Sequence, residues 1–127
     1  MPESIAWSLS AGGSSGSGIS AAGTLLVDAS MSVSRSFDAA GAETDVELMI
    51  DKVDNVSFLA ISSDLNDGKV TVQGTGDKRA LTGPIVLFGE AVKLFATDLS
   101  VVKVQNTSPD KAAHLTILVG LNIVSTP

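Results

Sequence analysis

The residues of this chain that could do chemistry are few and scattered. His114 is the only histidine, and it falls on the polar side of an alternating stretch near the C-terminus. A histidine that acts as a base needs a nucleophile and an orienting acid close to it in space. The sequence contains many serines and aspartates, but no constellation indicates which of them would join His114. We therefore predict no catalytic residues and no enzymatic activity.

Metal and cofactor sites are also poorly supported. Carboxylates gather loosely at Asp51, Asp54, Asp64 and Asp67, but "DLNDG" lacks both the ligand spacing and the closing Glu of a calcium loop. The glycine-rich "GGSSGSG" lacks the GK[ST] of a phosphate loop. The chain contains no cysteine, which excludes thiolate ligands and disulfides. We predict no metal site and no cofactor.

The charge balance narrows the class of partner. The formal net charge is −6, and eight Lys and Arg residues are scattered without forming a basic stripe. Binding to nucleic acid or to an anionic membrane is therefore not expected. The first residues, "MPESIAWSLSAGG", lack the basic and apolar regions of a signal peptide, and no apolar run reaches the roughly 18 residues of a membrane span. We expect synthesis in the cytoplasm.

The elements that would position these side chains are predicted to be strands. A chain of 127 residues is expected to form one domain, residues 1–127. Apolar residues make up 44% but aromatic residues only 4%, so the core must be aliphatic. Short alternating runs separated by Gly, Asn, Asp and Pro predict about eight or nine strands, including "AVKLFA". We predict an all-β fold, an antiparallel β-sandwich or a jelly-roll-like barrel.

Two predicted connections are hairpins. Asn66–Gly68 is expected to turn one strand back onto the next, and the polar stretch 106–112 to do so for the last two strands. Leu25–Phe37 alternates throughout and predicts one long strand with a buried apolar face.

Four residues are candidates for contact with a partner. The Gly/Ser-rich stretch 10–23 is predicted to be flexible, either as a mobile loop or as an arm that becomes ordered on a partner. Trp7, beside it, is either a core residue or an interface anchor. Ser30, Ser32 and Ser34 share the polar face of the long strand, which is either solvated or packed against another subunit.

The C-terminal third resembles a known kind of protein. The segment "LTGPIVLFGEAVKLFATDLSVVKVQNTSPDKAAHLTILVG" is similar to the last third of small β-sandwich proteins encoded beside the major capsid protein of tailed bacteriophages. The shared features are a strand ending in V-x-V-x-N-T-S, a short polar turn and a last strand L-x-I-L-V-G. The acidic, cysteine-free composition is similar as well. The resemblance covers about forty residues.

The resemblance implies a capsid decoration, or cement, protein. Such proteins lie on the outer surface of the virion, commonly as homotrimers at threefold positions, and hold units of the major capsid protein together. Two alternatives remain open. One is a surface-binding or adhesion module for a carbohydrate or a host receptor, although one Trp and no Tyr give it few aromatic contacts. The other is a tail-tube or head-fibre subunit; tail-tube proteins usually have a long hairpin, which the sequence does not reveal.

Overall fold

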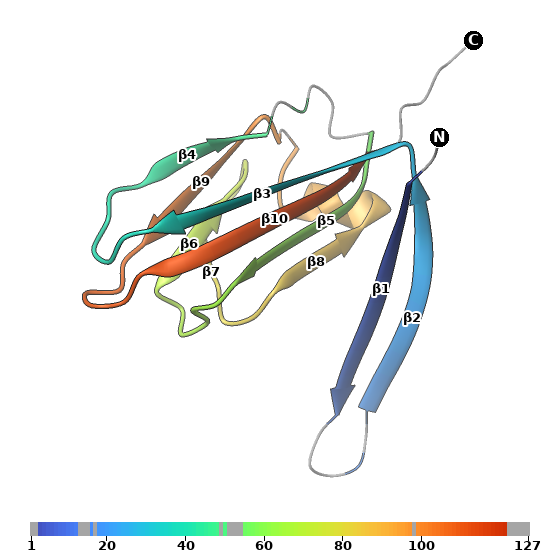
Figure 1. Cartoon of the computed structure of the whole chain (residues 1–127), viewed down its shortest axis with the longest axis horizontal. Helices are drawn as coiled ribbons and strands as arrows, with labels where there is room; N and C mark the ends of the chain where they lie inside the picture. The colour runs from blue at the N-terminus through green and yellow to red at the C-terminus, as the bar shows by residue number, and fades with distance from the viewer. Residues whose placement is uncertain are drawn as a thin grey trace.

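Ten antiparallel strands form the part of the chain that the structure describes, and they confirm the all-β prediction (Figure 1). The computed structural model describes residues 3–12, 16, 18–48, 50, 55–97 and 99–121. The strands are β1 (Glu3–Gly12), β2 (Gly18–Val27), β3 (Ala29–Phe37), β4 (Thr44–Glu47), β5 (Val56–Ser63), β6 (Val70–Gln73), β7 (Arg79–Ala80), β8 (Ile85–Phe88), β9 (Val101–Asn106) and β10 (Ala113–Leu121). A short 3-10 helix, η2 (Gly89–Leu94), follows β8.

Eight of these strands form a jelly-roll sandwich. The β10 sheet has the order β3-β10-β5-β8, and the β9 sheet has the order β4-β9-β6-β7. The pairing is nested along the chain, because β3 pairs with β10, β4 with β9, β5 with β8 and β6 with β7. This nesting is the wrapping of a jelly roll.

The core lies between the two sheets and is aliphatic, as the composition predicts. Leu59, Ile61 and Ile117 from the β10 sheet are almost fully buried, and so are Val72, Val102 and Val104 from the β9 sheet. Alternation along each strand places every second side chain in this layer. The sandwich therefore buries its apolar faces without a large aromatic core.

Both hairpin predictions were wrong, because the nested pairing separates strands that are adjacent in sequence. β5 and β6 belong to different sheets, so the Asn66–Gly68 turn connects the sheets. β9 and β10 likewise face each other across the core. Their connection is held by Asn106, whose Nδ2 donates to the carbonyl oxygens of Phe37 (3.2 Å) and Lys111 (2.8 Å). The N-T-S motif thus has a structural role here.

Two further elements differ from the sequence prediction. "AVKLFA" does not form a strand: it lies mostly in η2, and Val92, Phe95, Ala96 and Leu99 are buried at a helical spacing. The long strand from Leu25 to Phe37 is divided at Asp28, whose backbone N–H donates to the carbonyl of Leu121 (2.9 Å). Residues before Asp28 leave the sandwich, and residues after it form β3.

The stretch 10–23 is mostly strand, which corrects the prediction of a loop there. Residues 10–12 belong to β1 and residues 18–23 to β2, and these two strands pair in register from Glu3↔Val27 to Gly12↔Gly18. Figure 1 shows the β1–β2 hairpin projecting from one end of the sandwich. At about 3.4 Å per residue, each ten-residue strand extends about 34 Å, roughly three times the spacing between two packed sheets.

Candidate functional site

The β1–β2 hairpin has one apolar and one small, polar face. Directly opposite residues of an antiparallel pair point to the same side. The register therefore places on one face Ile5, Trp7, Leu9, Ala11, Ile19, Ala21, Gly23, Leu25 and Val27, with Glu3 opposite Val27 at the first pair of the hairpin. The other face is dominated by Ser, Ala and Thr, with Leu26 as its large apolar residue. The apolar face is the candidate contact surface of the molecule.

The base of this apolar face is docked on the outer face of the β10 sheet. Ile5, Val27 and Phe58 form a small buried cluster of their own. It sits over Gly120, where a Cβ atom would lie 2.8 Å from Ile5 Cδ1 and 3.0 Å from Val27 Cγ1. Glycine is therefore needed in β10 for the hairpin to approach the sheet this closely.

Trp7 extends the docked base to the edge of the β10 sheet. Its ring lies 5.0 Å from that of Phe88 in an edge-to-face arrangement, and Phe88 packs in the same way on Phe58 at 5.1 Å. Across the hairpin, Trp7 covers Gly23, where an added Cβ would lie only 3.0 Å from the indole. Trp7 is thus half-buried between the hairpin and the sheet, outside the main core.

The outer half of the same face contacts little. We call Leu9, Ala11, Ile19 and Ala21 the distal apolar face; all four side chains are exposed, Leu9 by 53% and Ile19 by 67%. An isolated two-stranded hairpin is only marginally stable in water. The apolar face of the hairpin is thus covered by the sandwich at its base and exposed to solvent along its outer half.

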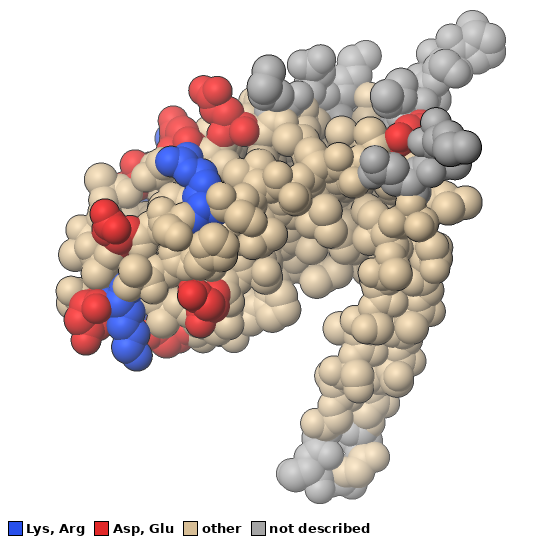
Figure 2. Space-filling model, viewed as in Figure 1, with Lys and Arg blue, Asp and Glu red and all other residues tan. Residues whose placement is uncertain are grey.

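Charge is absent from this region. Residues 4–27 include no Asp, Glu, Lys or Arg, although the chain carries a net charge of −6. Figure 2 shows most of the charged residues on the sandwich, towards the end away from the hairpin, and none along the projecting length of the hairpin. A surface without charge costs less to desolvate than the rest of this acidic molecule.

Ser30, Ser32 and Ser34 lie on the outer face of the β10 sheet, the face on which the hairpin docks. They are exposed on the edge strand β3, and Ser34 Oγ lies 3.1 Å from Thr116 Oγ1 of β10. The register places Ser30 opposite Gly120 and Ser32 opposite Leu118. The structure thus gathers the four candidate residues around one face, with Trp7 at the β8 edge and the serines at the β3 edge.

The residues that could do chemistry do not form a site in the described part of the chain. His114 is exposed, with its Nδ1 3.1 Å from Ser36 Oγ and its backbone N–H donating to Asp64 (2.8 Å). No group of three potential metal ligands occurs within the described residues. The letters G-x-S-x-G do occur at residues 12–16, but residues 13–15 of this motif lie outside the described residues.

The ion pairs of the sandwich lie at its solvent-exposed surface. Glu43 lies 3.0 Å from Lys78 and 4.0 Å from Lys103, and the hydrogen bond from Lys78 is the main cause that lowers the pKa of Glu43. All three side chains are at least one-third exposed. These ion pairs therefore describe a solvated surface.

Among the described residues, none of the helical segments is long and apolar enough to cross a bilayer. Comparisons of the chain with protein-family models, curated protein sequences and solved structures gave no match.

Proposed function

We propose that this protein is a structural subunit of a bacteriophage particle, a decoration protein that clamps neighbouring units of the major capsid protein on the outer capsid surface. The observation that carries the proposal is the hairpin: a long projection without charge from residue 4 to residue 27, whose base is anchored and whose distal apolar face is uncovered. The resemblance of residues 81–120 to phage decoration proteins agrees with it. The jelly-roll fold alone does not identify the function, because capsid proteins, lectins and cupins all have this fold.

The mechanism we propose is burial of the distal apolar face when copies of the protein assemble on the capsid lattice. Burying apolar surface contributes about 25 cal/mol per Å². A contact of this size is weak alone, but several contacts from one closed oligomer add into strong retention on a lattice. A homotrimer would match a threefold position by symmetry.

A shortened hairpin tests this proposal. Replacing residues 9–21 with Asn-Gly would close the hairpin after the Ser8↔Ala22 pair, keeping the docked base and removing the distal apolar face. We expect the isolated variant to melt close to the wild type, but to be lost from purified capsids and to fail to raise the temperature at which they burst. Equal retention of both proteins on capsids would refute the proposed clamp.

The hairpin also supports a second candidate, a tail-tube subunit. Such subunits stack rings through a long hairpin, and β1–β2 provides one that the sequence did not reveal. Electron microscopy of the purified protein separates the two roles. A tube subunit is expected to form long hollow tubes alone, whereas a decoration protein requires the capsid to form an ordered array.

The adhesion alternative has less support. Trp7, the only tryptophan, is engaged with Phe88 and Gly23 and offers no open stacking platform for a sugar ring. A glycan array that detected tight binding would favour adhesion over the clamp.

A further inference from the structure

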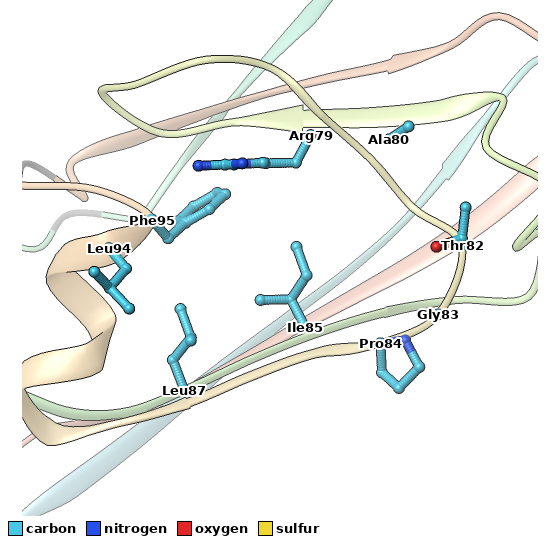
Figure 3. A pocket seen from close by; sticks show the side chains of 9 residues that line it. All are labelled: Arg79, Ala80, Thr82, Gly83, Pro84, Ile85, Leu87, Leu94 and Phe95. Atoms are coloured by element: carbon cyan, nitrogen blue, oxygen red, sulfur yellow. The ribbon is translucent and has the colours of Figure 1, made fainter. Parts of the chain in front are cut away.

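The sandwich is open on the side where β7 and β8, the edge strands of the two sheets, lie. A pocket of about 410 Å³ occupies this side, and its apolar lining includes Ile85, Leu87, Leu94 and Phe95 (Figure 3). Leu94, at the end of η2, is 76% exposed, the largest exposed fraction among the large apolar residues described. Arg79 lies on the opposite wall from Ile85 and Leu87. We call this hollow the β8 pocket.

The strand beside the β8 pocket lacks the usual protection of an edge strand. Natural proteins place charges, prolines or bulges on exposed edges to prevent pairing with other chains. β8 has the sequence Ile-Val-Leu-Phe, and all four side chains are partly or largely exposed. Pro84 precedes the strand, but the four residues of β8 themselves include neither a proline nor a charged residue. The pocket and the strand together form an apolar acceptor surface.

The distal apolar face of the hairpin is complementary to this acceptor in chemistry. It presents the aliphatic side chains Leu9 and Ile19 with small alanines between them, on a ribbon whose edges are unpaired in the single chain. Residues 4–27 of the hairpin and the four residues of β8 carry no charge, and the one charged residue that lines the pocket, Arg79, is basic. Two copies of this acidic chain can therefore meet there without bringing carboxylates together.

The protein's own hairpin cannot fill its own pocket. Trp7 packs on Phe88, which lies on the outer face of the β10 sheet together with Val86. Ile85 and Leu87 alternate with these residues and point to the other side of β8, into the pocket. Because the base of the hairpin is fixed on the outer face, a hairpin that occupies this pocket must belong to another copy.

We propose that the distal apolar face of the hairpin of one copy docks in the β8 pocket of a second copy, alongside the free edge of β8. The contact is head-to-tail, because the donor and acceptor surfaces differ. Repeated contacts of this kind close into a ring or continue as a chain, depending on the rotation between neighbours. This inference rests on the proposed assembly role. It adds a partner, a second copy of the chain, that a clamp on the capsid does not by itself require.

Three single substitutions test the contact by sedimentation velocity over a range of protein concentrations. Ile19→Glu places a charge on the distal apolar face, and Leu94→Glu places one in the β8 pocket; both residues are mostly exposed, so the fold should tolerate the changes. Ser20→Glu is the matched control, because Ser20 is exposed on the opposite face of the same strand. We expect the wild type and Ser20→Glu to form oligomers. The other two should weaken self-association by about tenfold or more.

Mixing the two defective variants gives the sharper result. Leu94→Glu retains an intact hairpin and Ile19→Glu retains an intact pocket, so one functional head-to-tail contact remains in the mixture. We expect a 1:1 heterodimer that grows no further, whereas each variant alone stays monomeric. Circular dichroism and melting of each variant check that the fold is intact.

The proposal is overturned if the wild type is monomeric at all concentrations, if Ser20→Glu dissociates as Ile19→Glu does, or if the mixture stays monomeric. Retention on capsids is measured for the same variants. A wild type that binds capsids but forms no head-to-tail contact would reject this inference and leave the decoration role standing. Oligomers that obey the mixing rule but ignore capsids would reject the decoration role instead.

Discussion

The sandwich and the β1–β2 hairpin differ in how much of their apolar surface is covered. In the sandwich, Leu59, Ile61 and Val72 have no exposed surface. Among the described residues of the hairpin only Ile5 and Val27 are buried, while Leu9 and Ile19 expose more than half of their surface. The sandwich can therefore be stable by its own contacts, whereas the outer hairpin has too few contacts to explain its apolar sequence. The difference shows that one region covers its own apolar surface, whereas the other leaves an apolar face open to solvent.

The largest expected effect is in the sandwich core. Leu59→Ala removes a fully buried side chain between the sheets and should lower the free energy of unfolding by about 2–5 kcal/mol. Chemical denaturation measures this loss. Leu9→Ala is the matched change in the hairpin and should alter the isolated protein by no more than about 0.5 kcal/mol, because Leu9 is mostly exposed. Equal effects of the two would remove the contrast between the regions.

A smaller loss of folding stability is expected from a change in the connection between β9 and β10. Asn106→Ala leaves the carbonyl groups of Phe37 and Lys111 without their donor and should cost about 1–3 kcal/mol. Asn106→Asp keeps the oxygen that accepts from the Ser108 backbone N–H but removes both donated bonds. A thermal melt in which Asn106→Asp matched the wild type would show that the donated bonds are dispensable.

A substitution at the base of the hairpin should destabilise the hairpin more than the sandwich. Trp7→Ala removes the edge-to-face contact with Phe88, and such contacts contribute about 0.5–1.5 kcal/mol beyond the area they bury. We expect faster hydrogen exchange at the amides of β1 and β2, with little change in the protection of β5 and β10. Uniformly faster exchange across both sheets would mean that the hairpin and the sandwich unfold as one unit.

The smallest effect is expected from the surface ion pairs. Glu43→Gln removes the contacts with Lys78 and Lys103, and we expect a marginal decrease in melting temperature at neutral pH. The pKa of Glu43 is lowered in the folded state, so its contribution is present at neutral pH and disappears as the pH falls through the range where this carboxyl becomes protonated. Melting curves of both proteins should therefore converge in acid. A difference that grew in acid would have the wrong sign.

The sequence predicted the fold class because alternation is a local signal. In β10, Leu115, Ile117 and Val119 fall on every second residue, and all three are buried. Alternation does not say which strand is the neighbour. β9 and β10 carry the same pattern whether they pair directly or face each other across a core, so the predicted hairpin became a connection between sheets. Nested pairing depends on contacts between strands far apart in sequence, which no local pattern contains.

The candidate site was predicted only in part. Trp7 and the three serines were proposed as contact residues from their residue types, and that proposal stays a prediction. The hairpin was missed because glycine and serine are poor strand formers. A signal was nevertheless available in the two strands. Ile5, Trp7 and Leu9 alternate before the Gly/Ser stretch, and Ile19, Ala21 and Leu25 share one parity after it. The β8 pocket had no local signal, since its walls come from β7, β8 and η2.

The central claim is that the distal apolar face is uncovered in the single molecule and covered in the assembled particle. Hydrogen exchange of residues 8–12 and 18–22, measured in the free protein and in the protein bound to capsids, tests it most directly. We predict fast exchange at these amides in the free monomer, at concentrations too low for self-association, strong protection after assembly, and unchanged protection of β5 and β10. Protection that was already complete in the free monomer, or exchange that remained fast on the capsid, would contradict the claim.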